Sequence, residues 1–214
     1  MSCKPQRMIS VMVEKQLPNT KDGKQVLERC KWRMCLNGKP LILHDDFAEM
    51  DSPTMNGFTH RLLHTIARLY GLASQQIDLP HCFLQTPLAD ILISWPADDR
   101  FTYKDDNGSP YVHSYTSAVY GGRNSSHLWY REFKIFATNK LGMICLPNLP
   151  SVFVKQVGTR VLICGLYIDD AECFYNDKEL IRWFQYQMHK KFKAKFFGRV
   201  WSYLGQEITY DDYD

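Results

Sequence analysis

The chain has 214 residues, of which 45% are hydrophobic and 14% aromatic. This composition excludes an intrinsically disordered chain, and the length provides for one domain with a sizeable core, or for one core with a small lobe attached. Lysine and arginine total 26 against 23 for aspartate and glutamate, a formal charge of +3. That balance permits a nucleic-acid partner without indicating one.

The seven cysteines are scattered, and no C-x-x-C pair occurs among them. Neither a zinc site nor a disulfide framework is therefore indicated, and the pattern is typical of a reduced, intracellular protein. The N-terminal stretch MSCKPQRMISVMVEKQ lacks the apolar core of a signal peptide. No apolar run reaches the length of about 18 residues that a spanning helix needs. We expect a soluble protein with no membrane partner.

In the first half of the chain, the pattern predicts a strand, a helix and a second strand. Apolar and polar residues alternate over 26–36, before the turn signal Asn37-Gly38. A helix is predicted from about 56 to 72. Its apolar face is predicted at Phe58, Leu62, Ile66 and Leu69. A short strand then leads through SQQID to Asp78.

The second half begins with a polar insert over 96–116, in which Asn107-Gly108 predicts a hairpin. A helix is predicted over 126–141, and another begins after Asn176 or Asp177. The last helix has an apolar face at Leu180, Phe184, Met188 and Phe192. Strands are predicted over 151–155, 160–168, 171–175 and 199–210.

The irregular alternation of helices and strands, with hairpins among them, predicts an α+β fold with an antiparallel sheet. Residues 1–214 are expected to form a single domain, with the hairpin insert 96–116 inside it. Trp129, Trp183, Phe184 and Trp201 are spaced as core residues rather than as a stacking surface for bases. His60 and His64 have the i, i+4 spacing of metal ligands, but we expect a solvated helix face because no third ligand is evident nearby.

The segment LICGLYIDDAEC (162–173) is nearly all apolar except for Asp169 and Asp170. It predicts a buried hairpin with the two aspartates at its turn, where aspartate is also a common purely structural residue. The sequence Tyr167-Ile168-Asp169-Asp170 resembles the Y-x-D-D signature of reverse transcriptases. That interpretation requires a third carboxylate, because two divalent metal ions need carboxylates converging from separate elements. Asp78 is the candidate, with a turn or helix-entry role as its alternative.

The chain as a whole resembles the copia-type LTR-retrotransposon reverse transcriptases, in order from about 31 to 208. KWRMCLNGK is similar to a fingers strand of that family, and QQIDLPHCFLQTPL to its Q-x-D-V-x-x-A-F-L-x-G-x-L motif. SAVYGGRNSSHLWY resembles K-S-L-Y-G-L-K-Q-S-P-R-A-W-Y, and PSVFVKQ resembles D-P-S-L-F. GLYIDD and SYLGQEI are similar to the Y-V-D-D hairpin and the terminal Y-x-L-G-x-E-I.

The resemblance implies a polymerase right-hand palm, its antiparallel sheet packed on helices, with partial fingers and no thumb. It implies RNA-directed DNA polymerase activity, with Asp78, Asp169 and Asp170 as catalytic residues that bind Mg²⁺ or Mn²⁺. Its partners would be dNTPs, an RNA or DNA template with primer, and other parts of a Pol polyprotein. Its location would be a cytoplasmic particle or the nucleus.

The family pattern also implies nucleotide-binding residues. They are Lys31, Arg33, Phe83, Tyr120, Gly121, Arg123 and Asn124. Phe83 would lie under the deoxyribose, and Asn124 stands where the family has glutamine. The acid that protonates pyrophosphate would be Lys193 or Lys195, for which a solvated helix end is the alternative.

Two rival functions use the same residues. The first is a catalytically inactive, retrotransposon-derived palm that acts as a scaffold or interaction protein. The second is a nuclease that uses the same carboxylates. The polymerase-like sequence around Asp169 and Asp170 weakens this hypothesis.

Overall fold

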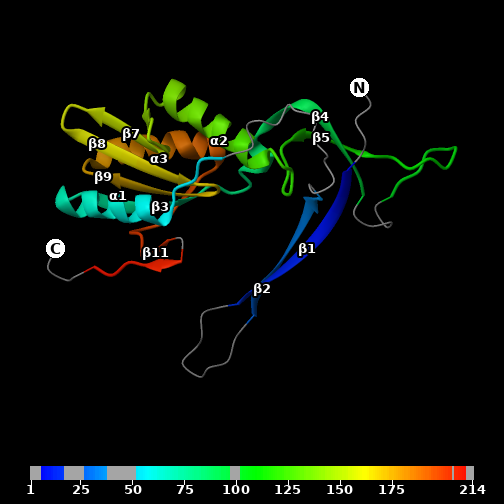
Figure 1. Ribbon diagram of the computed structural model, residues 1–214, viewed down its shortest axis with the longest axis horizontal. Helices are drawn as coiled ribbons and strands as arrows, with labels where there is room; N and C mark the ends of the chain where they lie inside the picture. The colour runs from blue at the N-terminus through cyan, green and yellow to red at the C-terminus, as the bar shows by residue number, and fades with distance from the viewer. Residues whose placement is uncertain (1–5, 17–26, 38–51, 97–101, 204, 211–214) are drawn as a thin grey trace. The chain divides into compact units, whose positions relative to one another are not determined.

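The computed structural model describes residues 6–16, 27–37, 52–96, 102–203 and 205–210 (Figure 1). The chain forms two compact units: unit 1 contains 1–50 and 86–125, and unit 2 contains 51–85 and 126–214. In the described part of the chain, no helix is long and apolar enough to cross a membrane. Mixed α and β structure with antiparallel pairing is confirmed.

Unit 1 is built on a four-stranded sheet in the order β2-β1-β4-β5. The strands are β1 (Gln6–Gln16), β2 (Leu27–Leu36), β4 (Pro87–Trp95) and β5 (His113–Ser117). β1 is antiparallel to β2 and parallel to β4. A small core of Met8, Leu36 and Val119 lies against this sheet. The predicted strand over 26–36 is confirmed as β2, whereas β1 and β4 were not predicted.

The predicted hairpin at Asn107-Gly108 is confirmed in the described part of the insert, 102–116. Gly108 adopts φ +82°, and its N–H donates to the Asp105 carbonyl at 2.9 Å. Lys104 and Pro110 form an antiparallel bridge across the turn. The end of the insert becomes β5, so this segment is an integral part of the unit 1 sheet.

Unit 2 contains a six-stranded sheet in the order β10-β3-β9-β8-β7-β6, in which every neighbouring pair is antiparallel. Its strands are β3 (Ala73–Asp78), β6 (Ile144–Leu146), β7 (Leu149–Val157), β8 (Arg160–Tyr167), β9 (Asp170–Tyr175) and β10 (Lys195–Phe196). The predicted strands over 151–155, 160–168 and 171–175 are confirmed.

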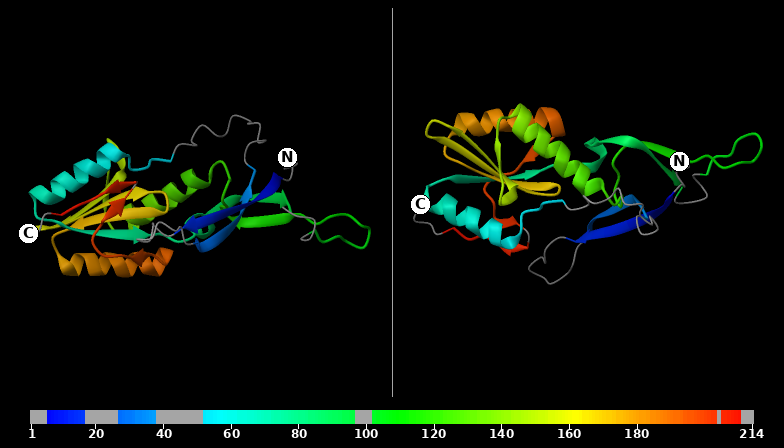
Figure 2. Two further views of the ribbon diagram at one scale, coloured as in Figure 1. Left: turned by 90° about the horizontal axis from the view of Figure 1, so that it is seen from below. Right: turned by 45° about the horizontal axis from the view of Figure 1, so that its top comes forward.

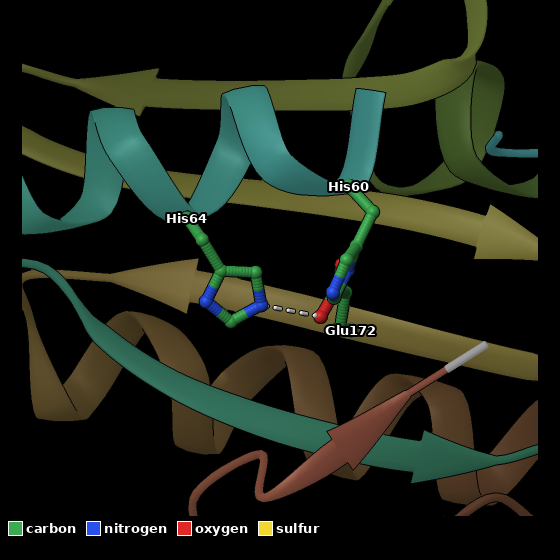
Figure 3. Close-up of side chains that lie close together, drawn as sticks. All are labelled: His60, His64 and Glu172. Atoms are coloured by element: carbon green, nitrogen blue, oxygen red, sulfur yellow. Dashed lines mark hydrogen bonds and ion pairs between the residues drawn. The ribbon is translucent and has the colours of Figure 1, made fainter. Parts of the chain in front are cut away.

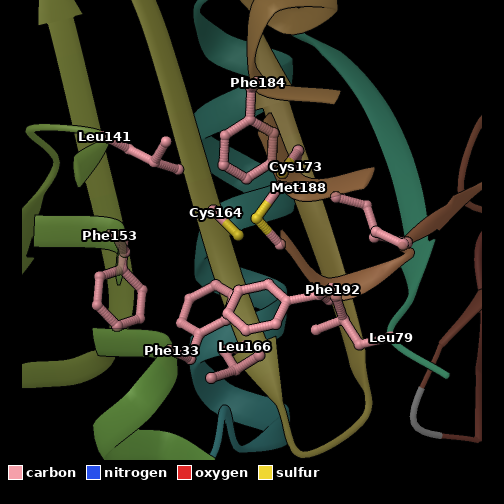
Figure 4. Close-up of a cluster of buried hydrophobic side chains, with 14 of the residues drawn as sticks. Leu79, Phe133, Leu141, Phe153, Cys164, Leu166, Cys173, Phe184, Met188 and Phe192 are labelled. Carbon is pink, nitrogen blue, oxygen red and sulfur yellow. The ribbon is translucent and has the colours of Figure 1, made fainter. Parts of the chain in front are cut away.

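Three helices pack on this sheet: α1 (Gly57–Leu69), α2 (Ser125–Ile135, followed by a π-helical turn, Phe136–Lys140) and α3 (Lys178–Phe192). α1 lies on one face, and α2 and α3 lie on the other (Figure 2). The face under α2 and α3 carries the larger core, which is rich in aromatic side chains (Figure 4). Its buried α3 side chains include Leu180, Phe184, Met188 and Phe192, as predicted.

The predicted apolar face of α1 is wrong at Phe58 and Leu69, whereas Ile66 packs against the core. Phe58 is 65% exposed and Leu69 is 74% exposed, while the buried side is formed by Thr59, His60, Leu63 and Ala67. His60 was expected on a solvated face, and this expectation is also wrong. The reason is that a polar partner inside the fold, Glu172 on β9, stabilises the buried imidazole, and hydropathy alone cannot register such a partner.

The predicted single strand over 199–210 is also wrong. The structure has two short paired strands, β11 (Ser202–Tyr203) and β12 (Gln206–Glu207), because Gly205 makes a turn at φ +72°. Tyr203 packs on the α1 face of unit 2. Trp201 is 61% exposed, so its predicted core role is wrong, whereas that of Trp129 is confirmed.

Candidate active site

The predicted aspartate hairpin is formed by β8 and β9. Tyr167 and Asp170 are the last paired residues, so that Ile168 and Asp169 alone make the connection. Ile168 adopts φ +49°, a left-handed conformation that is rare for a β-branched residue and costs on the order of 1–3 kcal/mol. A strained residue at this position indicates that the surrounding structure holds the turn in one conformation.

Two hydrogen bonds hold the backbone of this turn. The Trp129 indole N–H, from α2, donates to the Ile168 carbonyl at 2.6 Å. The Leu79 N–H, just after β3, donates to the Asp169 carbonyl at 2.7 Å. The turn is therefore attached to the helix on one side and to the end of β3 on the other, which offsets its strain.

Asp78 is the last residue of β3, and it lies directly opposite Asp170 of β9. Directly opposed residues in an antiparallel pair have Cα atoms about 4.5–5.5 Å apart. Asp169 follows the strand pair at the turn, and its carbonyl is bonded to the residue after Asp78. Asp78 thus lies at the same end of the sheet as Asp169 and Asp170, although 91 positions separate Asp78 from Asp169 in the sequence.

The electrostatics of this end of the sheet reflect the crowding of negative charge. Burial, followed by the charges of Asp169 and Asp78, raises the pKa of Asp170 to about 6. Burial and the charge of Asp169 raise the pKa of the buried Cys82 thiol to about 12. The charged form of a carboxyl group that lies beside two other carboxylates is disfavoured, and a bound cation would stabilise it.

The donor set also fits a hard divalent ion. Aspartate oxygens from two separate strands suit Mg²⁺, which keeps several waters as additional ligands. Among the described residues, the three aspartates do not bring one oxygen each within 4.8 Å of the others. Mutual repulsion opposes closer approach, and a bound cation would remove it.

Of the two candidate acids, Lys195 is the one that approaches the aspartates. It lies on β10 directly opposite Asp78, with its Nζ 3.9 Å from the Asp78 carboxylate. Lys193 ends α3 in the left-handed conformation, with φ +54°, and its N–H donates to the His189 carbonyl at 2.9 Å. The geometry therefore favours Lys195 over Lys193.

Phe83 follows the Asp78 strand at the start of a short 3-10 helix, Phe83–Gln85. Its side chain is half-buried and packs against the core below α2 and α3. Gln85 holds this turn, since its side-chain amide donates to the carbonyls of Pro80 at 2.6 Å and Phe192 at 2.9 Å. Phe83 thus has a defined position one turn beyond Asp78.

The predicted nucleotide-binding residues of unit 1 form a second group. The Arg33 guanidinium lies 5.5 Å from the centre of the Tyr120 ring, within the range of a cation–π contact. The Leu36 N–H donates to the Tyr120 carbonyl at 2.8 Å, which joins the loop after β5 to the end of β2. Lys31 pairs with Val13 on β1.

The loop after Tyr120 is shaped by Gly121, which adopts φ +79°. A Cβ at this position would collide with the Leu36 carbonyl oxygen and come within 3.0 Å of the Leu36 nitrogen. Arg123 and Asn124 are half-buried in the same loop, just before α2. Arg33, Tyr120 and Gly121 are therefore brought together by the contact between the end of β2 and this loop.

A cluster that sequence reasoning missed lies under α1. His60, His64 and Glu172 bring one ligand atom each within 4.8 Å of one another (Figure 3). The spacing of the two histidines was the available signal, but Glu172 is 112 positions from His60. Only the register of β9 under α1 reveals the third member.

The raised pKa of Asp170 leads to a prediction on stability without metal. Because the folded pKa lies above the ordinary 3.8, the native state holds its proton more tightly, and stability falls as pH rises from about 4 to about 6. Asp78→Asn removes one source of repulsion. We expect it to raise the free energy of unfolding at pH 7.5 by about 1 kcal/mol, the order of a partly solvated charge pair, and not at pH 4.

Urea unfolding in EDTA at the two pH values measures this effect, with Asp106→Asn at an exposed position as the control. Asp78→Asn also loses the ion pair with Lys195. This pair spans 3.9 Å and involves an exposed lysine, so its loss changes the free energy of unfolding little. An Asp78→Asn gain that is equal at both pH values would show that repulsion on Asp170 is not its cause.

An antiparallel sheet that presents an aspartate pair at a hairpin, beside a third aspartate on the neighbouring strand, is typical of nucleic-acid polymerases. The family model "Reverse transcriptase (RNA-dependent DNA polymerase)" matches residues 6–212. The chain belongs to this family, and the resemblance to the copia-type retrotransposon enzymes is confirmed.

Three curated relatives are similar to most of the chain. The "Retrovirus-related Pol polyprotein from transposon RE2" and its RE1 counterpart, both of Arabidopsis thaliana, are each 26% identical over 182 residues, or 85% of this chain. The "Retrovirus-related Pol polyprotein from transposon TNT 1-94" of Nicotiana tabacum is 26% identical over 191 residues, or 88% of this chain. The matched region spans only 12–14% of the length of these relatives.

Proposed function

We propose that this chain is the fingers-palm core of an RNA-directed DNA polymerase that joins dNTPs to a primer 3′-end. The observation that carries the proposal is the strand register that sets Asp78 opposite Asp170, with Asp169 at the adjoining turn. Unit 2 corresponds to the palm and unit 1 to partial fingers, within one reverse transcriptase domain over 1–214.

In this proposal Asp78, Asp169 and Asp170 would hold Mg²⁺ or Mn²⁺. A divalent ion bound there would supply a lowered pKa for the primer 3′-hydroxyl and positive charge for the leaving pyrophosphate. The chain's own contribution is to fix the carboxylates, through the strained turn at Ile168 and its hydrogen bonds from Trp129 and Leu79. Such preorganised positioning is the main protein contribution to phosphoryl transfer.

The remaining predicted residues take positioning roles. Phe83 would lie under the deoxyribose, and of the two candidate acids Lys195 is the one proposed to protonate the leaving pyrophosphate, since its Nζ lies 3.9 Å from the Asp78 carboxylate. Lys31 and Arg33 hold the triphosphate, with the Arg33 guanidinium oriented by the Tyr120 ring. Tyr120, Gly121, Arg123 and Asn124 line the nucleotide and template pocket.

Template and primer are bound through phosphate contacts, without sequence-specific recognition. Other parts of a Pol polyprotein are the expected partners, since the curated relatives carry that name.

Primer extension by the 214-residue chain on poly(rA)–oligo(dT) tests the proposal, with dTTP and with Mg²⁺ or Mn²⁺. We expect metal-dependent addition of nucleotides to the primer that is abolished by EDTA. Folded protein that neither extends the primer nor binds Mn²⁺ would contradict the proposal and favour a scaffold protein derived from a retrotransposon. Cleavage of the template without extension would instead favour a nuclease.

A further inference from the structure

The cluster of His60, His64 and Glu172 lies on the α1 face of unit 2 and takes no part in the proposed polymerase chemistry. His60 Nδ1 lies 2.6 Å from one Glu172 carboxylate oxygen, and His64 Nε2 lies 3.0 Å from the other (Figure 3). Glu172 is 0% exposed and His60 only 2%. Both histidines come from successive turns of α1, and the carboxylate comes from the middle of β9.

A carboxylate buried to this degree requires compensating positive charge or full hydrogen bonding. A divalent cation held by one atom from each of the three groups would place positive charge directly beside the buried carboxylate. Two imidazole nitrogens and one carboxylate oxygen are a ligand set that Zn²⁺ uses, with a fourth position left open.

A buried hydroxyl beside the cluster gives a second, independent observation. The Tyr203 ring stacks on the His60 ring, with centroids 5.4 Å apart and planes at 24°. Its hydroxyl is buried and has no hydrogen-bond partner among the described residues. Buried hydroxyls are nearly always hydrogen-bonded, so this group indicates that a further polar species, such as a metal-bound water, belongs beside the Tyr203 hydroxyl.

The third observation is an entry path. His64 is 18% exposed and is among the residues that line a pocket of about 870 Å³. The pocket lies between the end of α1, the start of β3 and the C-terminal segment, whose Arg199 and Tyr210 also line it. An ion in solution reaches the cluster through His64, whereas His60 and Glu172 lie behind it.

We propose that His60, His64 and Glu172 form a Zn²⁺ site that links α1 to β9, separate from the aspartates and independent of the polymerase proposal. Three metal–ligand bonds would replace the two hydrogen bonds of the metal-free chain, and zinc–ligand distances of about 2.0–2.2 Å require only small shifts within the 4.8 Å cluster. Because β9 begins at Asp170, the ion would also stabilise the strand that carries the aspartate hairpin.

The test is calorimetric titration of Zn²⁺ into the metal-stripped chain that carries Asp78→Asn and Asp169→Asn, so that two of the three aspartates are removed. We expect one equivalent to bind with micromolar or tighter affinity and to raise the melting temperature. His64→Gln in the same chain should weaken binding by at least about 100-fold, more than the loss of an outer partner does. His113→Gln, in unit 1, should leave binding unchanged.

X-ray absorption of the zinc-loaded chain gives a readout that needs no substitution in the cluster, because imidazole ligands have a distinct scattering signature. Two imidazoles and oxygen ligands are expected. Absence of stoichiometric binding, zinc without imidazole ligands, or full affinity in folded His64→Gln would each overturn the proposal. The cluster would then be a hydrogen-bonded histidine–glutamate group only.

Discussion

Asp169→Asn is expected to reduce metal-dependent primer extension by at least about 100-fold, the effect of removing one preorganised electrostatic group from a transition state. Asparagine has nearly the same size but lacks the charge that a divalent ion requires. The turn should keep its conformation, since the hydrogen bonds of this segment involve the carbonyls of Ile168 and Asp169 rather than the Asp169 side chain.

Mn²⁺-dependent stabilisation in a melting experiment provides a second measurement, which does not require the chain to extend a primer by itself. We expect the wild-type chain to gain stability with Mn²⁺ and Asp169→Asn to gain much less. Asp106→Asn, which is exposed in the unit 1 insert, serves as the matched control for loss of one negative charge. Wild-type primer extension together with wild-type stabilisation by Mn²⁺ in Asp169→Asn would rule out a metal-ligand role for Asp169.

Gly121→Ala is expected to destabilise unit 1 by about 3 kcal/mol or more. A positive φ costs a non-glycine residue about 1–2 kcal/mol, and overpacking costs a further 1–3 kcal/mol or so. The added Cβ would meet the backbone of Leu36, which cannot move without disturbing the end of β2. The Leu36 N–H that donates to Tyr120 would lose its partner as the loop is displaced.

Gly108→Ala is the matched control, because Gly108 also has a positive φ, lies in the same unit and has open space around its Cβ position. It should cost only the conformational strain, about 1–2 kcal/mol. Amide hydrogen exchange at Leu36 reports the local opening. Protection should fall at least about 30-fold further in Gly121→Ala than in Gly108→Ala, which corresponds to about 2 kcal/mol. Equal losses would mean that the steric contact with Leu36 is unimportant.

The local sequence pattern was sufficient to predict an element where that element packs against a single apolar core. The buried face of α3, which includes Phe184, was predicted because it packs against one apolar core. Apolar residues at i+4 spacing indicate such a face directly. The hairpin around Asp169 was predicted because two apolar arms enclose a polar turn. The α1 face failed because its buried side mixes Leu63 and Ala67 with His60, whose partner is a buried carboxylate.

Motif order and residues close in the chain were enough to predict the family of this protein, the three aspartates as its candidate site and the hairpin that carries two of them. The pairing of Asp78 with Asp170, the contact of Arg33 with Tyr120 and the approach of Lys195 to Asp78 became visible only in the folded chain. The same is true of the hydrogen bonds from His60 and His64 to Glu172. Each of these contacts depends on strand register or helix packing between distant segments, and local periodicity carries no information about either.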